Sequence, residues 1–150
     1  ALVRQFNDKA EIIECRHAPR VLRDVYTREE LPLEWLKGKT LATLSGIAVP
    51  QCFENSLRKL GAKVIYCERY ADHHRYEPPE IIDALNRAAD RGCDALLTTE
   101  KDAVRFPRLE TTPVPAYYLR VDIEILAGAE NFHDAVDHIR NAKPREERTI

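Results

Sequence analysis

The 150-residue sequence contains no methionine, even at position 1, and no run of about 20 apolar residues that would span a membrane. It also lacks a C-x-x-C pair, because its cysteines at 15, 52, 67 and 93 are scattered. We therefore expect reduced thiols rather than a disulfide framework or a zinc site. We expect no signal peptide, because the first residues have neither a basic start nor a long apolar run. The missing initiator methionine leads us to expect that the chain begins downstream of the start of its gene.

Two further absences narrow the function. The net charge is −2, from 23 basic and 25 acidic residues, so we expect no nucleic-acid partner. The phosphate-binding sequence G-x-x-x-x-G-K-[ST] does not occur. A hydrophobic content of 44% and a charged content of 32% indicate a soluble globular protein, and the length suits one domain.

Strand-like and helix-like segments alternate through the middle of the chain. Short apolar runs at 41–44, 63–68 and 94–97 predict buried strands, and helical spacing of apolar residues follows Pro50 and Pro79. Alternation at these intervals favours right-handed crossovers between parallel strands. We therefore predict an α/β fold, a small three-layer α/β/α domain with a mostly parallel sheet.

Other segments predict additional elements. Residues 117–125 alternate strictly between apolar and polar side chains, which predicts a strand with one solvated face. Such a strand needs an antiparallel partner, and 11–16 is the best candidate, with His17-Ala18-Pro19 expected to end it. Thr27-x-x-Glu30 has the spacing of a capping box and predicts a short helix.

The two ends of the chain have helical character. Residues 1–8 look like the last turns of a helix, and Phe132, Val136 and Ile139 recur at helical spacing. Residues 143–150 are expected to form a disordered tail.

Residues that could take part in catalysis or ligand binding follow each of the three predicted parallel strands. Asp72, His73 and His74 follow the second strand, and the carboxyl ends of parallel strands are where ligands bind in such sheets. A carboxylate beside an imidazole can fix its tautomer and raise its basicity. The plainer interpretation is a solvated loop in which Asp72 caps a turn.

The other two turns are less specific. Gly46 allows close backbone approach, although a simple tight turn also explains it. Thr99 and Asp102 have the spacing of a helix cap, whereas Lys101 opposes the helix dipole and is not explained by capping. Asp72 and His73 are the candidate catalytic residues. Further candidates at this edge are Ser45, Gly46, Tyr76, Thr99, Glu100, Lys101 and Asp102.

Four motifs occur in order along the chain: Ser45-Gly46-Ile47-Ala48-Val49-Pro50-x-x-Phe53, Leu60-Gly61-Ala62, Asp72-His73-His74-x-Tyr76, and Thr98-Thr99-Glu100-Lys101-Asp102-Ala103-Val104-Arg105. The series resembles the C-terminal half of the tetraacyldisaccharide 4′-kinases, the lipid A kinases of Gram-negative bacteria. The first motif in that family usually reads Cys-Gly-Ile-Gly-Asn-Pro, from which Ser45, Ala48 and Val49 depart. The Asp-His-x-Tyr and Thr-Glu-Lys-Asp-Ala motifs match fully.

The resemblance implies ATP-dependent phosphorylation of the 4′-hydroxyl of a lipid disaccharide 1-phosphate at the cytoplasmic face of the inner membrane. It implies two α/β domains joined by a two-stranded linker, for which 1–20 and 116–126 are suited. The phosphate loop, the Mg²⁺ ligands, the catalytic carboxylate and the membrane contact would belong to an N-terminal kinase domain. Residues 1–150 would then be one C-terminal domain, inactive alone, with no ATP or metal ligands of its own. His73 would assist the catalytic carboxylate, and His74 would inherit no role.

Two alternatives remain open at this point. One is a free-standing, non-catalytic α/β binding module, against which the missing methionine and the incomplete first helix count. The other is a metal-dependent phosphoesterase of the Asp-His-His type. Such an enzyme needs further metal ligands upstream, where Asp8, His17 and Asp24 are present without a D-x-D pair.

Overall fold

The computed structural model describes residues 2–141, which belong to two compact units. Residues 19–122 form the larger unit, and residues 2–18 together with 123–141 belong to the smaller one. Strands β1 (Glu14–Asp24) and β6 (Ala116–Ala127) contribute residues to both units. The tail expected at 143–150 lies outside the described residues.

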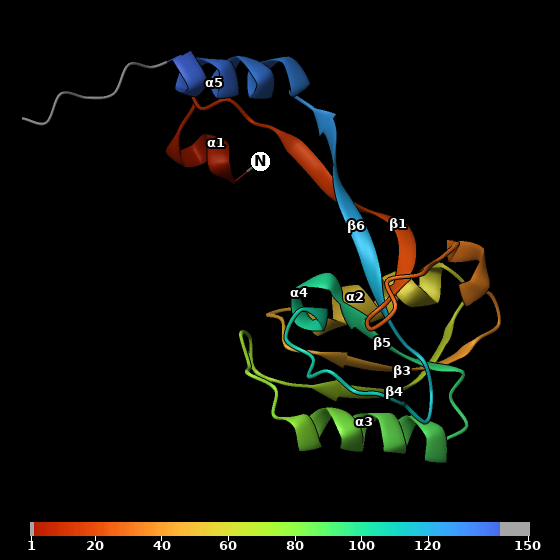
Figure 1. Cartoon of the computed structure of the whole chain (residues 1–150). Helices are drawn as coiled ribbons and strands as arrows, with labels where there is room; N and C mark the ends of the chain where they lie inside the picture. Colours follow the sequence, from red (N-terminus) through yellow and green to blue (C-terminus); the bar gives the residue numbers. More distant parts are fainter. Residues whose placement is uncertain (1, 142–150) are drawn as a thin grey trace, which may run out of the picture. The chain divides into compact units, whose positions relative to one another are not determined.

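The larger unit is organised around a mixed sheet whose strand order is β2-β1-β6-β5-β3-β4 (Figure 1). Strand β3 (Thr40–Ser45) pairs in parallel with β4 (Lys63–Arg69) and with β5 (Ala95–Thr99). These are the three parallel strands that the apolar runs predict. The predicted α/β fold with a mostly parallel sheet is confirmed.

Helices cover both faces of this sheet. Helix α3 (Pro78–Asp90) and α2 (Pro50–Lys59) lie on opposite sides of it, the latter beside the 3₁₀ helix η1 (Leu33–Leu36) (Figure 1). Successive strand residues point to opposite faces. Accordingly Leu96 packs in the cluster that contains α3, whereas its neighbour Leu97 packs in the cluster that contains α2. The two cores make the three layers that the sequence predicts.

Strand β6 differs from the sequence prediction over its first residues. Ala116–Leu119 pairs in parallel with β5, so this stretch is part of the main sheet. On its other side β6 neighbours β1, and the pairs Arg16–Glu124 and Arg20–Asp122 run in opposite order along the two strands, which makes this pairing antiparallel. The apolar alternation predicted the antiparallel partner correctly but gave no sign of the parallel one.

Two predicted boundaries are wrong. Pro19 does not end β1, which continues to Asp24, because β2 (Glu30–Leu31) pairs with β1 at Leu22 and Arg23 and leaves the outer side of Pro19 without a hydrogen-bonding strand. No helix begins at Thr27. The carboxylate of Asp24 instead accepts the N–H groups of Tyr26 and Thr27, both at 2.8 Å, and closes a turn.

The smaller unit contains the short helix α1 (Val3–Phe6) and helix α5 (Ala129–Asn141), so both predicted terminal helices are present. Within it, the Asn131 amide donates to the Glu11 carboxylate at 2.5 Å. Apolar side chains remain exposed on both helices, including Phe6 at 84% and Ile139 at 75%. Among residues 2–141, no helix combines the length and the apolar character needed to cross a bilayer.

Candidate functional site

Three turns follow the carboxyl ends of β3, β4 and β5, and the described hydrogen bonds tie them together. Strand β3 leads to Gly46, β4 leads to the loop with Asp72 and His73, and β5 leads directly into helix α4 (Glu100–Ala103). Because the three strands are parallel neighbours, these turns meet at one edge of the sheet. The sequence prediction that they gather there is correct.

Gly46 allows the first turn to pack closely against the other two. A Cβ atom at this position would lie 2.8 Å from the Tyr76 hydroxyl and 3.2 Å from the carbonyl oxygen of Ala71. No side chain fits at those distances, so the turn is tight for a packing reason rather than through a positive φ. Ser45 beside it is buried, and its carbonyl oxygen accepts the N–H of Tyr70 at 2.9 Å.

The Asp72 carboxylate is held by Lys101. Their charged atoms lie 2.8 Å apart, and this hydrogen bond is the main reason that the pKa of Asp72 is lowered from its usual value. Lys101 is the residue that helix capping leaves unexplained, and its partner is the carboxylate of the neighbouring loop.

His73 is the exposed imidazole of the site. Its side chain is 72% exposed, and its Nε2 lies 3.8 Å from Asp72 Oδ2. Its backbone has φ +63°, the left-handed conformation that costs a non-glycine residue about 1–2 kcal/mol. Backbone strain of this kind concentrates at functional sites. The loop therefore presents this imidazole outward beside a fixed carboxylate.

His74 has a different environment from His73. Its Nε2 lies 3.0 Å from a Glu80 carboxylate oxygen, and its ring stacks on Tyr70 with the centroids 4.5 Å apart. The carboxylate of Glu80 also accepts the N–H of Glu77 at 2.8 Å. His74 thus fastens the loop to the start of α3 and is not a free group in a solvent-facing loop.

Asp102 and Tyr76 are buried below these turns. The Asp102 carboxylate is fully buried and accepts hydrogen bonds from the Gly46 N–H and the Thr99 hydroxyl, at 3.0 and 2.7 Å. Thr99 also caps α4, as the spacing predicts, by accepting the N–H of Asp102. Burial, followed by the Asp102 carboxylate, raises the pKa of Tyr76. Glu100, the remaining candidate, is exposed in the first turn of α4.

Sequence reasoning missed three supporting side chains. Arg105 donates to the His74 carbonyl oxygen at 3.2 Å, and Glu80 holds the His74 ring. Glu54 on α2 is buried and accepts two hydrogen bonds from Arg69, at 2.7 and 2.8 Å, which anchors the end of β4. Glu80 carries a signal in its capping position, because it is the third residue of α3. The Glu54–Arg69 pair spans 15 positions and has no local signal.

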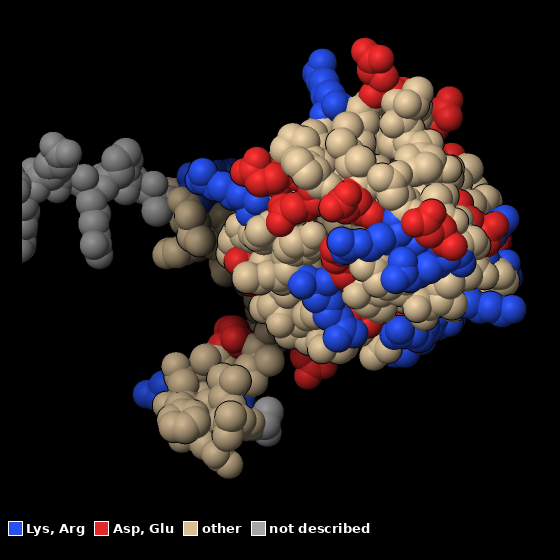
Figure 2. Space-filling model, turned by 90° about the horizontal axis from the view of Figure 1, so that it is seen from below, with Lys and Arg blue, Asp and Glu red and all other residues tan. Residues whose placement is uncertain are grey.

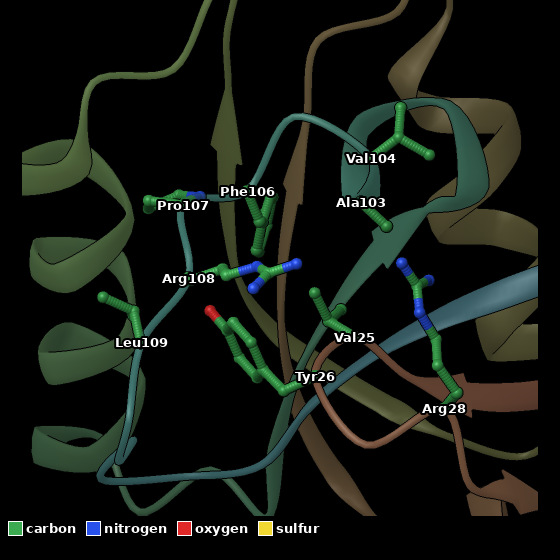
Figure 3. A pocket seen from close by; sticks show the side chains of 9 residues that line it. All are labelled: Val25, Tyr26, Arg28, Ala103, Val104, Phe106, Pro107, Arg108 and Leu109. Atoms are coloured by element: carbon green, nitrogen blue, oxygen red, sulfur yellow. The ribbon is translucent and has the colours of Figure 1, made fainter.

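A pocket of about 470 Å³ lies elsewhere on the larger unit (Figure 3). Two segments line it, 25–28 and 103–109, and it contains none of the predicted site residues. The hydroxyl of Tyr26 is buried there without a hydrogen-bond partner among the described residues, and burial raises the pKa of Tyr26 to about 12. Because the pocket lacks carboxylate and imidazole groups, it is not the candidate catalytic edge.

The described residues do not fit a metal centre. Residues 2–141 contain no group of three or more His, Cys, Asp or Glu side chains placed to hold an ion. His73 and His74 have separate carboxylate partners, Asp72 and Glu80, which disfavours their sharing a metal as an Asp-His-His phosphoesterase would require. On the face that Figure 2 shows, acidic and basic side chains are intermixed, in keeping with the net charge of −2.

The fold and the site define an α/β domain with helices on both sheet faces and polar turns gathered at the carboxyl edge of the parallel strands. The chain belongs to the family described as tetraacyldisaccharide-1-P 4′-kinase, whose model matches residues 2–141. This confirms the resemblance that the four motifs indicate.

Individual relatives of this chain carry the same family name. The tetraacyldisaccharide 4′-kinase of Anaeromyxobacter dehalogenans (strain 2CP-C) is 42% identical over 132 residues, covering 87% of this chain and 35% of that protein. The one of Syntrophus aciditrophicus (strain SB) is 28% identical, covering 73% of this chain and 29% of that protein. The crystal structure of Aquifex aeolicus LpxK in complex with ATP matches with a TM-score of 0.54 at 20% identity, covering 90% of this chain and 40% of the solved one, and supports the fold. The chain thus spans about a third of the length of these relatives.

Proposed function

We propose that this chain is the C-terminal domain of an ATP-dependent kinase that phosphorylates the 4′-hydroxyl of tetraacyldisaccharide 1-phosphate in lipid A biosynthesis. Family membership and the kinase names of the relatives support the reaction class. One structural observation carries the assignment of the site. It is the exposed His73 imidazole, held in a strained backbone beside the Asp72–Lys101 pair at the carboxyl edge.

The proposed division of labour follows from what this chain contains. ATP and Mg²⁺ would supply the phosphoryl group and its charge neutralisation, and would be bound mainly by an N-terminal kinase domain, since the described residues offer no metal site. His73 would assist the catalytic carboxylate of that domain by holding the proton that leaves the substrate hydroxyl. Lys101 keeps the Asp72 carboxylate in place beside the imidazole.

The architecture fits a domain that works with another one. We propose that the segments 1–20 and 116–126, which contribute to strands β1 and β6, form the inter-domain linker. We also propose that the exposed apolar side chains of α1 and α5 contact the N-terminal domain. The reaction would take place at the cytoplasmic face of the inner membrane, with the membrane surface contacted by that other domain.

A comparison of two proteins tests this proposal. The complete protein should transfer phosphate from ATP to tetraacyldisaccharide 1-phosphate, whereas residues 1–150 alone should show no turnover above blank. The isolated chain should bind ATP no more tightly than about millimolar. Turnover by residues 1–150, or a micromolar dissociation constant in calorimetry, would contradict the proposed division of labour. A complete protein without kinase activity would refute the function itself.

A further inference from the structure

Asp102 is more deeply buried than a helix-capping acid needs to be. An acidic residue in the first turn of a helix normally stays solvated, and there its charge interacts with the helix dipole. Asp102 instead has no exposed surface. Burying a carboxylate is costly unless donors surround it. Its Oδ2 accepts from the Gly46 N–H and the Thr99 hydroxyl, and its nearest cationic group is Arg105 at 3.9 Å.

The other oxygen of Asp102 and the hydroxyl of Tyr76 both face Gly46. Asp102 Oδ1 and the Tyr76 hydroxyl are both buried without a hydrogen-bond partner among the described residues. They lie 3.4 and 2.8 Å from the point that a Cβ atom of Gly46 would occupy. Buried polar atoms without partners are destabilising and call for an explanation beyond stability.

Asp102 connects the turns that carry the candidate catalytic groups. Asp102 binds the N–H of Gly46, and the carbonyl oxygen of Gly46 in turn accepts the N–H of His73 at 3.3 Å. The residue before it, Lys101, binds the Asp72 carboxylate at 2.8 Å. The location of both Asp72 and His73 therefore depends on two backbone turns that this one carboxylate joins.

We propose that Asp102 is a positioning residue that holds the turns of β3 and β5 together and thereby places His73 for the reaction. This inference rests on the kinase function proposed above. Asp102 does not touch substrate, and its effect is transmitted through the Gly46 carbonyl oxygen and through Lys101.

Asparagine and alanine variants of the complete protein separate positioning from charge. Asp102→Asn keeps an oxygen that can accept both hydrogen bonds, so its kcat should stay within about tenfold of the wild-type value. Asp102→Ala removes the acceptor and should lower kcat by about 10²-fold, the scale of a small misplacement of a catalytic group, with the KM for ATP unchanged. Asp83→Ala, at an exposed position of α3, is the matched control and should have no effect.

A double-mutant cycle with His73 gives a readout that a purely structural role would not produce. If Asp102 acts by placing His73, His73→Ala should cost about 10²–10³-fold in the wild type but less than about tenfold in the Asp102→Ala background. Losses that multiply in full would overturn the proposal, as would an Asp102→Asn variant as impaired as Asp102→Ala.

Hydrogen exchange followed by mass spectrometry tests the coupling without any kinase activity. Asp102→Ala should increase exchange in peptides that cover 44–48 and 70–76, whereas Asp102→Asn should not. If Asp102→Ala does not fold, Thr99→Val removes one hydrogen bond from the same carboxylate and should loosen the same two peptides. Unchanged exchange would refute the positioning role. If the wild-type protein has no kinase activity but Asp102→Ala still increases exchange in these peptides, only the proposed function is refuted.

Discussion

His73 and His74 are adjacent in the sequence, yet the structure predicts opposite consequences when each is replaced by alanine. The His73 side chain is 72% exposed, and its interaction with Asp72 is a loose one at 3.8 Å. The His74 side chain is 28% exposed, stacks on Tyr70, and shares a hydrogen bond with the Glu80 carboxylate. One variant should therefore lose activity and the other should lose stability.

The expected loss of stability for His74→Ala follows from its two contacts. An aromatic pair contributes about 0.5–1.5 kcal/mol beyond area burial, and a hydrogen bond contributes about 0.5–1.5 kcal/mol. We expect a decrease of about 1–2 kcal/mol in the free energy of unfolding. His73→Ala should change it by no more than about 0.5 kcal/mol, as is usual at exposed positions.

Activity should follow the reverse order. In the complete kinase, His73→Ala should lower kcat by about 10²–10³-fold, the scale of losing one positioned acid–base group. His74→Ala should cost less than about fivefold when assayed well below its unfolding temperature. Urea denaturation and steady-state kinetics on the same preparations measure both quantities. A larger kcat loss for His74→Ala than for His73→Ala would show that the catalytic role has been assigned to the wrong histidine.

Three further predictions concern the stability and reactivity of the chain. Gly46→Ala should destabilise it by about 1–3 kcal/mol, because the new Cβ atom would lie 2.8 Å from the Tyr76 hydroxyl; an unchanged melting temperature would show that the turn is not tightly packed. Glu54→Gln should make the free energy of unfolding less dependent on pH in the acid range. Hydrogen bonds from Arg69 lower the pKa of Glu54 from 4.5, so the stabilisation that this carboxylate provides is present above pH 4.5 and is lost as the pH falls through its folded value; identical urea midpoints against pH for both proteins would contradict this. Cys93, buried and with its thiol pKa raised by burial, should resist a thiol reagent until the protein unfolds, which peptide mapping would detect.

Local pattern was enough to predict the elements of the parallel core. The apolar runs at 41–44, 63–68 and 94–97 became β3, β4 and β5 with ends shifted by one or two residues, because buried strands need continuous apolar side chains. Pro50 began a helix where its fixed φ is favourable. The motifs also indicated the family, since their residue types and order are properties of the sequence itself.

Two features that depend on distant residues could not be predicted in this way. The parallel contact of Ala116–Leu119 with β5 depends on which strand edge remains free after the others have paired. The continuation of β1 through Pro19 depends on the absence of a partner strand on one side. Neither condition leaves a mark in the local sequence.

The sequence by itself determined which chemical groups are present at the edge of the sheet, and the tertiary structure decided what each of them does. Lys101 is an anomaly in its own helix and becomes intelligible once Asp72 lies 2.8 Å away. His73 and His74 are the same residue type and cannot be told apart by composition. In the structure the left-handed backbone at His73 leaves its ring exposed, whereas Tyr70 and Glu80 contact the ring of His74. The physical reason is that burial, hydrogen bonding and charge pairing depend on distances across the fold, which residue spacing along the chain does not fix.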